Sequence, residues 1–195
     1  MAKQTKGNPL TLFGRWFALA ARKERLHDAV ALATAGGAGR PSVRYVLLKS
    51  ADERGFTFFT HEDSAKGKDL AHNPRAAMAF YWNAIGRQVR IEGRVVGVPA
   101  DEADAYWATR PRGSQLGSAA SQQSRKVASR AVLLARVRAL ARLYAGHAVP
   151  RPRHWVGYRI VPGTFEFWTR GAFRLHHRVQ FTRRGGGWRK ALLQP

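Results

Sequence analysis

The feature that most constrains the fold is a rhythm of short apolar and aromatic runs separated by turn residues. Turns rich in glycine or charged residues, such as 36–41 and 51–55, interrupt runs of strand length. We predict strands at 29–35, 42–49, 56–60, 76–82, 88–98, 156–161, 164–168, 178–184 and 187–193. Strands and helices do not alternate regularly, so a parallel sheet is not expected. The pattern favours a mainly β protein, an antiparallel barrel with flanking helices.

Four segments have the periodicity or capping residues of helices. We predict helices at 11–26, 64–73, from Pro99 through Trp107, and at 126–144. The runs 42–49 and 56–60 flank a turn and are predicted to form a hairpin. Residues 1–9 are predicted to be a flexible tail, and 10–195 a single domain.

Composition narrows the class of protein. Hydrophobic residues make up 45% of the chain, enough to bury a core. The net charge of +22 favours phosphates, nucleic acid or acidic partners. The basic residues are spread along the chain, so we do not expect nucleic acid as a partner. Cysteine is absent, the N-terminus lacks the apolar run of a signal peptide, and 16–21 is too short to span a membrane. We therefore expect a cytoplasmic protein without a membrane partner.

Several kinds of catalytic site have no support in the sequence. The seven histidines lack ligand spacing, and the adjacent His176 and His177 would point to opposite faces of a strand. The chain has no HExxH, GxSxG, Walker or GxGxxG motif. We therefore predict no metal site and no nucleophile–base triad.

The segment 108–126, ATRPRGSQLGSAASQQSRK, carries an unusual density of side-chain hydrogen-bond donors. It is either a solvated loop or a site for anionic oxygens, since Arg and Lys are the residues that bind phosphate. Segments 44–49, 60–66 and 173–178 offer further donors. Interleaved aromatics favour a pocket for a flat, phosphorylated ring such as a flavin. They are Phe59, Tyr106 and Trp168.

These segments, in this order, resemble the pyridoxamine 5′-phosphate oxidase family over about residues 13–195. The matching pieces include RYVLLK (44–49), NPRAAMAFYW (73–82), YWATRPRGSQLGS (106–118), FEFW (165–168) and RLHHR (174–178). The resemblance implies an FMN-binding split β-barrel of Greek-key type and a homodimer with FMN at the interface. It also implies a reaction of vitamin B6 metabolism. Pyridoxamine or pyridoxine 5′-phosphate is oxidised to pyridoxal 5′-phosphate, and O2 is reduced to hydrogen peroxide.

The same resemblance implies a role for individual residues. Those expected to bind FMN are Arg44, Lys49, Phe59, Thr60, Ser64, Lys66, Gln88, Gln123, Ser124, Trp168 and Arg178. Those expected to hold the substrate phosphate are Lys49, Tyr106, Arg110 and Ser114. Arg174 and His176 are expected to be the catalytic pair, which holds the substrate ring against the flavin.

Two positions depart from the family pattern. Ala65 stands where the family usually has a phosphate-facing arginine, and His177 stands where it often has an acid. A related flavin oxidase of phenazine-type secondary metabolism is therefore the alternative, followed by a non-catalytic flavin or nucleic-acid binder. The substrate-phosphate residues Lys49, Arg110 and Ser114 are retained, which favours the vitamin oxidase.

Overall fold

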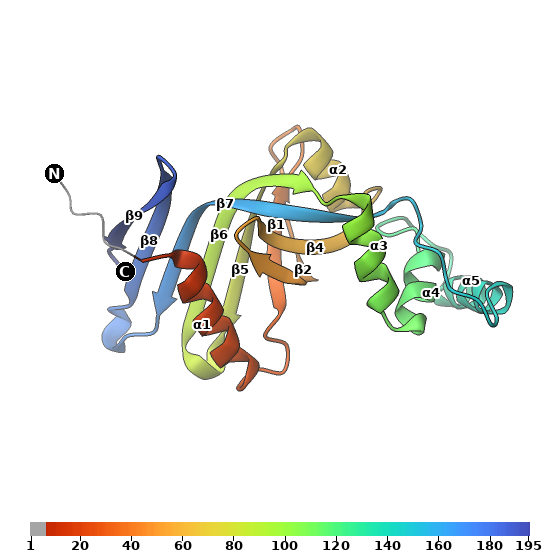
Figure 1. The fold of residues 1–195 in the computed structure, drawn as a ribbon, viewed down its shortest axis with the longest axis horizontal. Helices are drawn as coiled ribbons and strands as arrows, with labels where there is room; N and C mark the ends of the chain where they lie inside the picture. Colours follow the sequence, from red (N-terminus) through yellow and green to blue (C-terminus); the bar gives the residue numbers. More distant parts are fainter. Residues whose placement is uncertain (1–6) are drawn as a thin grey trace.

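A computed structural model describes residues 7–195, in which nine strands form one antiparallel sheet flanked by helices (Figure 1). The strands are β1 (Ala29–Ala35), β2 (Pro41–Leu47), β3 (Ser50–Asp52), β4 (Gly55–His61), β5 (Arg75–Trp82), β6 (Arg87–Gly97), β7 (Trp155–Thr169), β8 (His177–Arg184) and β9 (Gly187–Leu193). The helices are α1 (Pro9–Ala21), α2 (Ala65–His72), α3 (Ala100–Thr109), α4 (Arg112–Ala120) and α5 (Arg130–Leu143), with short 3-10 turns η1 (Asn83–Ile85) and η2 (Ala172–Arg174).

The long strand β7 gives the sheet its divided shape. Seven strands follow the order β2-β1-β5-β6-β7-β4-β3, and β8 and β9 extend the sheet from β7. The first part of β7 pairs with β4, and its last part pairs with β8. Both partners lie on the edge of β7 opposite β6. The sheet therefore curls and splits along β7, which confirms the predicted mainly β, split-barrel architecture.

Two predicted strands form one continuous strand, β7, which contains a bulge between them. Residues 156–161 and 164–168 belong to β7, and its register with β6 shifts at Glu92 and Gly93. Pro162 of β7 lies at this register shift and is tolerated there, because a bulge interrupts the ladder of hydrogen bonds. A Cβ on Gly93 would lie 2.1 Å from the carbonyl oxygen of Val161, so the close approach of the strands requires glycine.

The main core lies between the curled sheet and α1. Asn8 caps this helix by accepting a hydrogen bond from the Leu10 amide at 2.9 Å, and Pro9 occupies its first turn. Phe13 of α1 is buried and packs edge-on against Phe56 of β4, with ring centroids 4.8 Å apart. The remaining buried aromatics of this core are Phe58, Phe80, Trp82, Phe165, Phe167 and Phe181.

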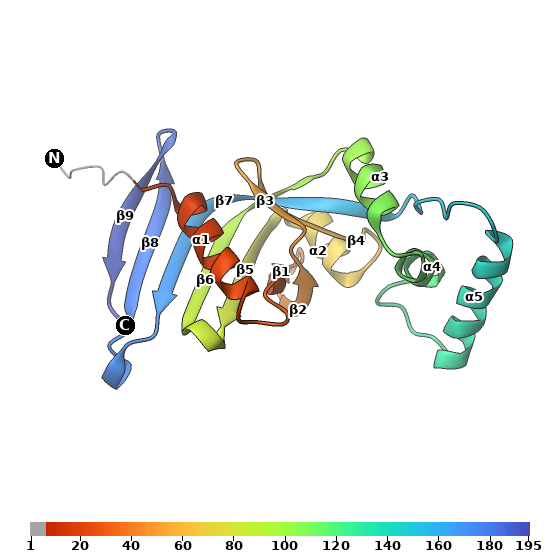
Figure 2. The same ribbon diagram turned by 60° about the horizontal axis from the view of Figure 1, so that its bottom comes forward.

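Helices α3, α4 and α5 form a separate lobe with a small core of its own, here called the helical lobe. Figures 1 and 2 show it at the opposite end of the molecule from β8 and β9. Trp107, Leu116, Val149 and Trp155 are buried at its centre. Trp155 is also the first residue of β7, so the lobe is attached directly to the sheet.

The structure differs from the predicted elements in several places. The first helix ends at Ala21 rather than 26, because the charged run that follows it has no apolar face to bury and Leu26 is exposed. The predicted hairpin of 42–49 with 56–60 is wrong. Seven residue pairs hold β2 to β1, whereas the turn at Asp52–Gly55 joins β4 only to the short β3.

A further difference is α4, which the sequence did not reveal. Its two glycines and its single large apolar residue, Leu116, hide the helical period. The predicted helix 126–144 begins later, at Arg130, where the Ser129 hydroxyl accepts a hydrogen bond from the Val132 amide.

Residues 1–6 of the predicted tail lie outside the described residues. Within 7–195, no helix is both long enough and apolar enough to cross a membrane.

Candidate active site

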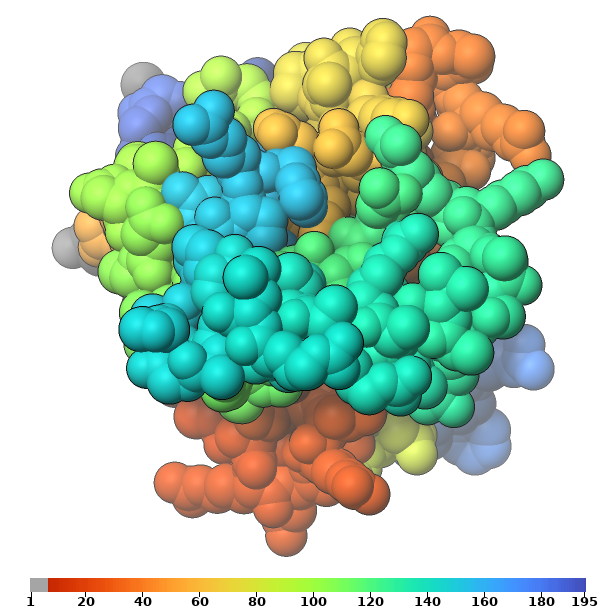
Figure 3. Space-filling model, turned by 90° about the vertical axis from the view of Figure 1, so that its right-hand side faces the viewer, coloured from red at the N-terminus to blue at the C-terminus, as the bar shows by residue number. Residues whose placement is uncertain are grey.

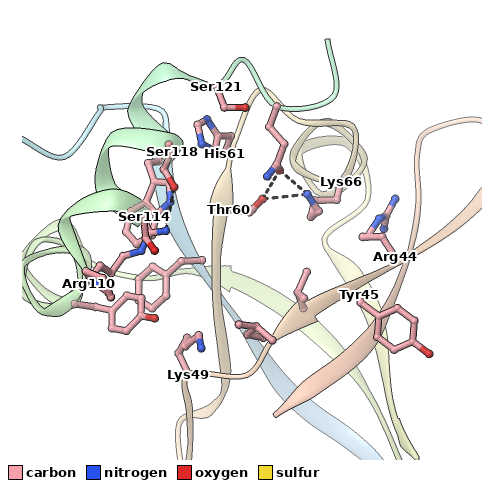
Figure 4. Close-up of a pocket in the computed structure, with 18 of the residues that line it drawn as sticks. Arg44, Tyr45, Lys49, Thr60, His61, Lys66, Arg110, Ser114, Ser118 and Ser121 are labelled. Carbon is pink, nitrogen blue, oxygen red and sulfur yellow. Dashed lines mark hydrogen bonds between the residues drawn. The ribbon is translucent and has the colours of Figure 1, made fainter. Parts of the chain in front are cut away.

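A pocket of about 730 Å³ opens between β2, β4, α2 and α4 (Figure 4). Four cationic side chains from three different parts of the chain line it: Arg44, Lys49, Lys66 and Arg110. Of the described residues that line this pocket, none is a carboxylate. A cavity lined by four cations and no carboxylate favours an anionic ligand, because like charges that converge repel one another.

Lys66 stands at the start of α2. Ser64 is buried and caps this helix by accepting a hydrogen bond from the Gly67 amide at 3.3 Å. A Cβ on Gly67 would lie 2.1 Å from the Glu62 carbonyl oxygen, so the tight entry into the helix needs glycine. The Lys66 side chain consequently points into the pocket from a fixed backbone.

The Lys66 ammonium is buried among neutral oxygens. It donates to Gln123 Oε1 at 2.7 Å and to Thr60 Oγ1 at 3.1 Å. Burial, and secondly the charge of Arg44, lower the pKa of Lys66 to about 8. An anion beside this group would offset both effects, so the buried lysine fits a phosphate site.

Arg44 is held by a network behind the pocket wall. Its guanidinium donates to Thr34 Oγ1 at 2.6 Å and to Ser42 Oγ at 2.8 Å. Asp69 accepts from the Thr34 hydroxyl at 2.6 Å and lies 3.7 Å from the Arg44 guanidinium. Thr34 is buried, so α2 and β1 together fix the direction in which Arg44 faces.

Arg110 enters the pocket from the other side, between α3 and α4. Its guanidinium carbon lies 5.0 Å from the Trp107 ring and 4.9 Å from the Trp155 ring, both as cation–π contacts. One terminal nitrogen donates to Ser118 Oγ at 3.0 Å, whereas the other is buried without a partner among the described residues. A buried donor with no acceptor is costly, so a ligand oxygen fits at this position.

Aromatic rings form the wall beside Arg110. Phe59 stacks on Tyr106 at 4.3 Å and on Trp155 at 5.0 Å between ring centroids. Lys49 also faces the pocket, and its ammonium lies 3.3 Å from Asp28 Oδ2. Figure 4 shows Arg110 and Lys49 toward one end of the pocket and Lys66 and Arg44 toward the other.

His61 lines the same pocket and is buried against His154, with ring centroids 4.8 Å apart. Burial first, and then the nearby charges of His154, Lys66 and Arg110, lower the pKa of His61 to about 4. His61 is therefore uncharged at neutral pH and adds nothing to the positive field of the pocket.

The other predicted site residues form a second group, here called the β6–β8 group: Gln88, Trp168, Arg174, His176 and Arg178. Gln88, Trp168 and Arg178 are paired across three neighbouring strands, which makes one row on the sheet. The His176 ring packs on Trp168 at 4.6 Å between centroids. None of the five is among the residues that line the pocket.

Arg174 of the β6–β8 group and its neighbour Phe173 have positive φ angles. Phe173 has a φ of 51° and Arg174 a φ of 63°, which side chains other than glycine rarely adopt. Arg178 is fixed instead by side-chain contacts, donating to Glu166 Oε1 at 2.8 Å and to the Gln194 carbonyl at 2.9 Å.

The structure thus divides the predicted site residues into two sets. The pocket gathers Arg44, Lys49, Phe59, Thr60, Lys66, Tyr106, Arg110, Ser114 and Gln123. Ser64 lies behind it as the cap of α2, and Ser124 is exposed next to Gln123, with a φ of 69°. Among residues 7–195, no three His, Cys, Asp or Glu side chains are grouped as metal ligands would be.

Among the lining residues that were not predicted individually are His61, Ser118, Ser121 and Trp155. The two serines lie within the donor-rich segment 108–126, and His61 lies in the donor segment 60–66. No sequence signal marked Trp155.

The fold and pocket together define a split-barrel protein whose cationic, aromatic-walled pocket has the chemistry to fit a phosphorylated, partly aromatic ligand. Two family models match the chain: pyridoxamine 5′-phosphate oxidase over residues 19–144, and the pyridoxine 5′-phosphate oxidase C-terminal dimerisation region over residues 155–195. The chain belongs to the pyridoxamine 5′-phosphate oxidase family.

Curated relatives and solved structures agree with this membership. The chain is 53% identical over 171 residues to a pyridoxine/pyridoxamine 5′-phosphate oxidase of Anaeromyxobacter dehalogenans, covering 87% of this chain and 86% of the relative. It is 48% identical to the enzyme of that name from Burkholderia thailandensis, covering 100% and 92%.

Among solved structures, PhzG from Burkholderia lata, in complex with tetrahydrophenazine-1-carboxylic acid, superposes with a TM-score of 0.91. It is 39% identical, and the match covers 96% of this chain and 93% of PhzG. A pyridoxamine 5′-phosphate oxidase-related, FMN-binding protein of Nostoc punctiforme shares the fold, with a TM-score of 0.77 at 15% identity and coverage of 97% and 99%.

Proposed function

We propose that the protein is an FMN-dependent oxidase that converts pyridoxamine or pyridoxine 5′-phosphate to pyridoxal 5′-phosphate. The observation that carries this proposal is a single pocket with cationic residues at both ends and an aromatic wall between β4 and the helical lobe. A reaction between FMN and a phosphorylated vitamin needs two phosphate sites near one another, and this pocket offers both.

The end of the pocket at Lys66 and Arg44 would hold the FMN phosphate. Thr60 and Gln123 complete it, since their oxygens already contact the Lys66 ammonium. The fit rests on two features: Lys66 is buried without a carboxylate partner among the described residues, and Arg44 is pre-oriented by Thr34. A pre-oriented donor loses little conformational entropy when it binds its ligand.

The end at Arg110 would hold the substrate phosphate, with Lys49, Tyr106 and Ser114. The unpartnered nitrogen of Arg110 is the strongest support, because a phosphate oxygen would satisfy it. The rings of Trp107 and Trp155 keep the guanidinium in place on one side.

We further propose that a homodimer completes the site, with the β6–β8 group of one protomer facing the pocket of its partner. The matched dimerisation region, residues 155–195, contains four of the five members of this group. Next to Arg174 and His176, Phe173 is 95% exposed and Leu175 is 71% exposed. Val43, Tyr45 and Leu47 are exposed on alternate positions of β2, which also lines the pocket. One exposed apolar surface lies beside the β6–β8 group and the other lies beside the pocket, which fits a contact between two protomers.

In this arrangement the protein positions the reactants and the cofactor supplies the redox chemistry. FMN, when bound, would supply two-electron redox chemistry with O2 as the final acceptor and hydrogen peroxide as a product; with the amine substrate, water would also be consumed and ammonia released. Arg174 and His176 would hold the pyridine ring. The Gly171 amide donates a hydrogen bond to Nδ1 of His176 at 3.2 Å, so Nδ1 is the acceptor. In the neutral imidazole the proton is then on Nε2, which can donate to the substrate.

A second candidate substrate class is suggested by the likeness to PhzG, whose structure contains a phenazine precursor. That ligand bears a carboxylate and no phosphate. The phosphate end of the pocket, with Lys49 and the half-satisfied Arg110, favours the vitamin phosphate instead.

A subunit-mixing experiment tests the shared site. Arg110→Ala alters the pocket and Arg174→Ala alters the β6–β8 group, so each homodimer should be nearly inactive when assayed at a substrate concentration below the wild-type KM. Mixed dimers would carry one doubly altered site and one intact site. Random exchange should therefore restore about a quarter of wild-type activity, as symmetry requires. If mixing restores no activity although subunits exchange, each site is built from a single chain and the dimer proposal is wrong.

A further inference from the structure

The acidic residues are distributed unevenly along the chain. Of the 12 acidic residues, 11 lie at or before Asp104, and Glu166 is the twelfth. Residues 105–165 therefore contain no acid but 11 Lys and Arg. Most of this segment builds the helical lobe, so at this end of the molecule it carries positive charge without any acidic residue of its own to offset it.

Helix α5 presents the exposed part of this charge. The inner side of α5 packs on the lobe core through Val137, Leu140 and Ala141. Beyond the C-terminal end of α5, the His147 carbonyl accepts a hydrogen bond from Arg112 of α4 at 2.8 Å. None of the 14 residues of α5 is buried. Figure 3 looks onto this end of the molecule, which α5 and its flanking loops cover.

The cations of α5 and the preceding loop are exposed and are not neutralised by the protein. The set is Arg125, Lys126, Arg130, Arg136, Arg138 and Arg142, and within residues 7–195 none of them forms an ion pair with a carboxylate. Arg138 and Arg142 are four residues apart and repel each other on one helix face. Arg130 lies in the first turn, where the helix dipole disfavours positive charge. A bound polyanion would relieve both unfavourable interactions.

We propose that this α5 face binds the phosphate backbone of nucleic acid, as an activity separate from the oxidase site. Ala131, Ala135 and Ala139 lie between the arginines on the outer side of the helix, where small side chains allow a backbone to approach closely. Phosphates spaced along a strand match a row of arginines, whereas a single small anion would meet only one or two of them.

The same helix is poorly suited to a lipid bilayer. Its exposed leucines, Leu134 and Leu143, are nine residues apart and so lie on opposite sides of the helix axis. An interfacial helix needs one continuous apolar face, which this arrangement lacks. The proposal reverses the expectation that nucleic acid is not a partner. The basic residues are spread along the chain, but the acids that would offset them are absent from residues 105–165.

The experiment uses the FMN-loaded protein and a fluorescein-labelled DNA duplex of arbitrary sequence. Fluorescence anisotropy gives the binding constant at salt concentrations from about 50 to 200 mM, and the slope of log K against log salt counts the phosphate contacts. The variant Arg136→Ala/Arg138→Ala/Arg142→Ala should bind more weakly and lower that slope by about 2–3, at about 0.9 per lost contact. None of the three arginines lines the oxidase pocket, so FMN content and turnover should stay unchanged.

The matched control removes the same charge elsewhere. Arg15, Arg22 and Arg25 are exposed on and after α1, outside the helical lobe, and form no ion pair with another described residue. Arg15→Ala/Arg22→Ala/Arg25→Ala should keep the wild-type slope. Equal losses in the two triple variants would mean that only net charge matters, and the proposal would be wrong. It would also fail if the wild type bound vesicles containing phosphatidylserine but not the duplex.

Discussion

Substitution of Lys66 should separate stability from cofactor binding. Lys66 is 7% exposed, and its ammonium contacts only neutral oxygens among the described residues. Its pKa falls from 10.5 to about 8. Each pH unit corresponds to about 1.4 kcal/mol, so keeping this charge costs the flavin-free protein about 3 kcal/mol at neutral pH.

Lys66→Met keeps the aliphatic chain and removes the charge. The hydrogen bonds to Thr60 and Gln123 are lost, at about 1 kcal/mol, although Gln123 Oε1 still accepts from the Thr60 hydroxyl at 2.8 Å. The flavin-free variant should therefore be more stable by about 2 kcal/mol, or roughly 4–8 °C in Tm. Its Kd for FMN should rise by about 10- to 100-fold, because a charged hydrogen bond to phosphate is absent.

The pH dependence has a defined sign. The unfolded chain keeps the Lys66 proton up to its ordinary pKa of 10.5, whereas the native protein releases it near 8. Between these values the unfolded state binds more protons, so wild-type stability rises with pH. The advantage of Lys66→Met should be complete below pH 8, shrink through this interval and vanish above it.

Thermal unfolding of flavin-free protein at fixed concentration, near pH 7 and near pH 10, measures the stability effect, and quenching of FMN fluorescence measures affinity. Lys68→Met is the matched control for stability, since Lys68 lies on the same helix but is exposed. A variant that melts at or below the wild type near pH 7 would refute the claim that the Lys66 charge is unfavourable in the empty site.

Three further variants test individual contacts. Arg110→Met should raise KM for pyridoxine 5′-phosphate by about 10- to 100-fold without changing FMN content, since its unpartnered nitrogen is assigned to the substrate phosphate; steady-state kinetics with a flavin absorbance check decides this. Arg174→Ala should cut turnover far more than FMN content, and wild-type turnover in this variant would remove Arg174 from the site. Asp69→Ala should weaken FMN binding several-fold at unchanged kcat under saturating FMN, because Asp69 and Thr34 orient Arg44. Asp69→Asn should restore part of the loss, because its amide oxygen can still accept from Thr34.

The strands were predictable because their signals are local. The alternation in β6, with Val89, Ile91 and Val95 on one side, corresponds to the buried side of that strand. Pairing was less predictable, since nothing near β2 shows that it pairs with β1 rather than with β4. Which strands pair depends on how the whole core packs, and short-range sequence patterns carry no information about that packing.

The sequence indicated candidate site residues but not how they are arranged in space. Ordered motifs indicated Arg110 and Arg174 equally well, yet the structure places only Arg110 at the pocket. Supporting residues such as Thr34 and Asp69 carried no signal, because their role depends on where β1 and α2 meet. Ala65 is exposed on α2 and contributes no charge, so in the proposed site the phosphate at this end would be held by Lys66 and Arg44.

The most direct test of the account is the visible spectrum of the purified protein as pyridoxine 5′-phosphate is added under air, with hydrogen peroxide measured in the same sample. The account predicts a flavin spectrum that bleaches when oxygen is depleted, and peroxide released in step with pyridoxal 5′-phosphate. A flavin spectrum that responds to neither phosphorylated vitamin would contradict the proposed substrate, and a protein that cannot be loaded with FMN would contradict the site itself.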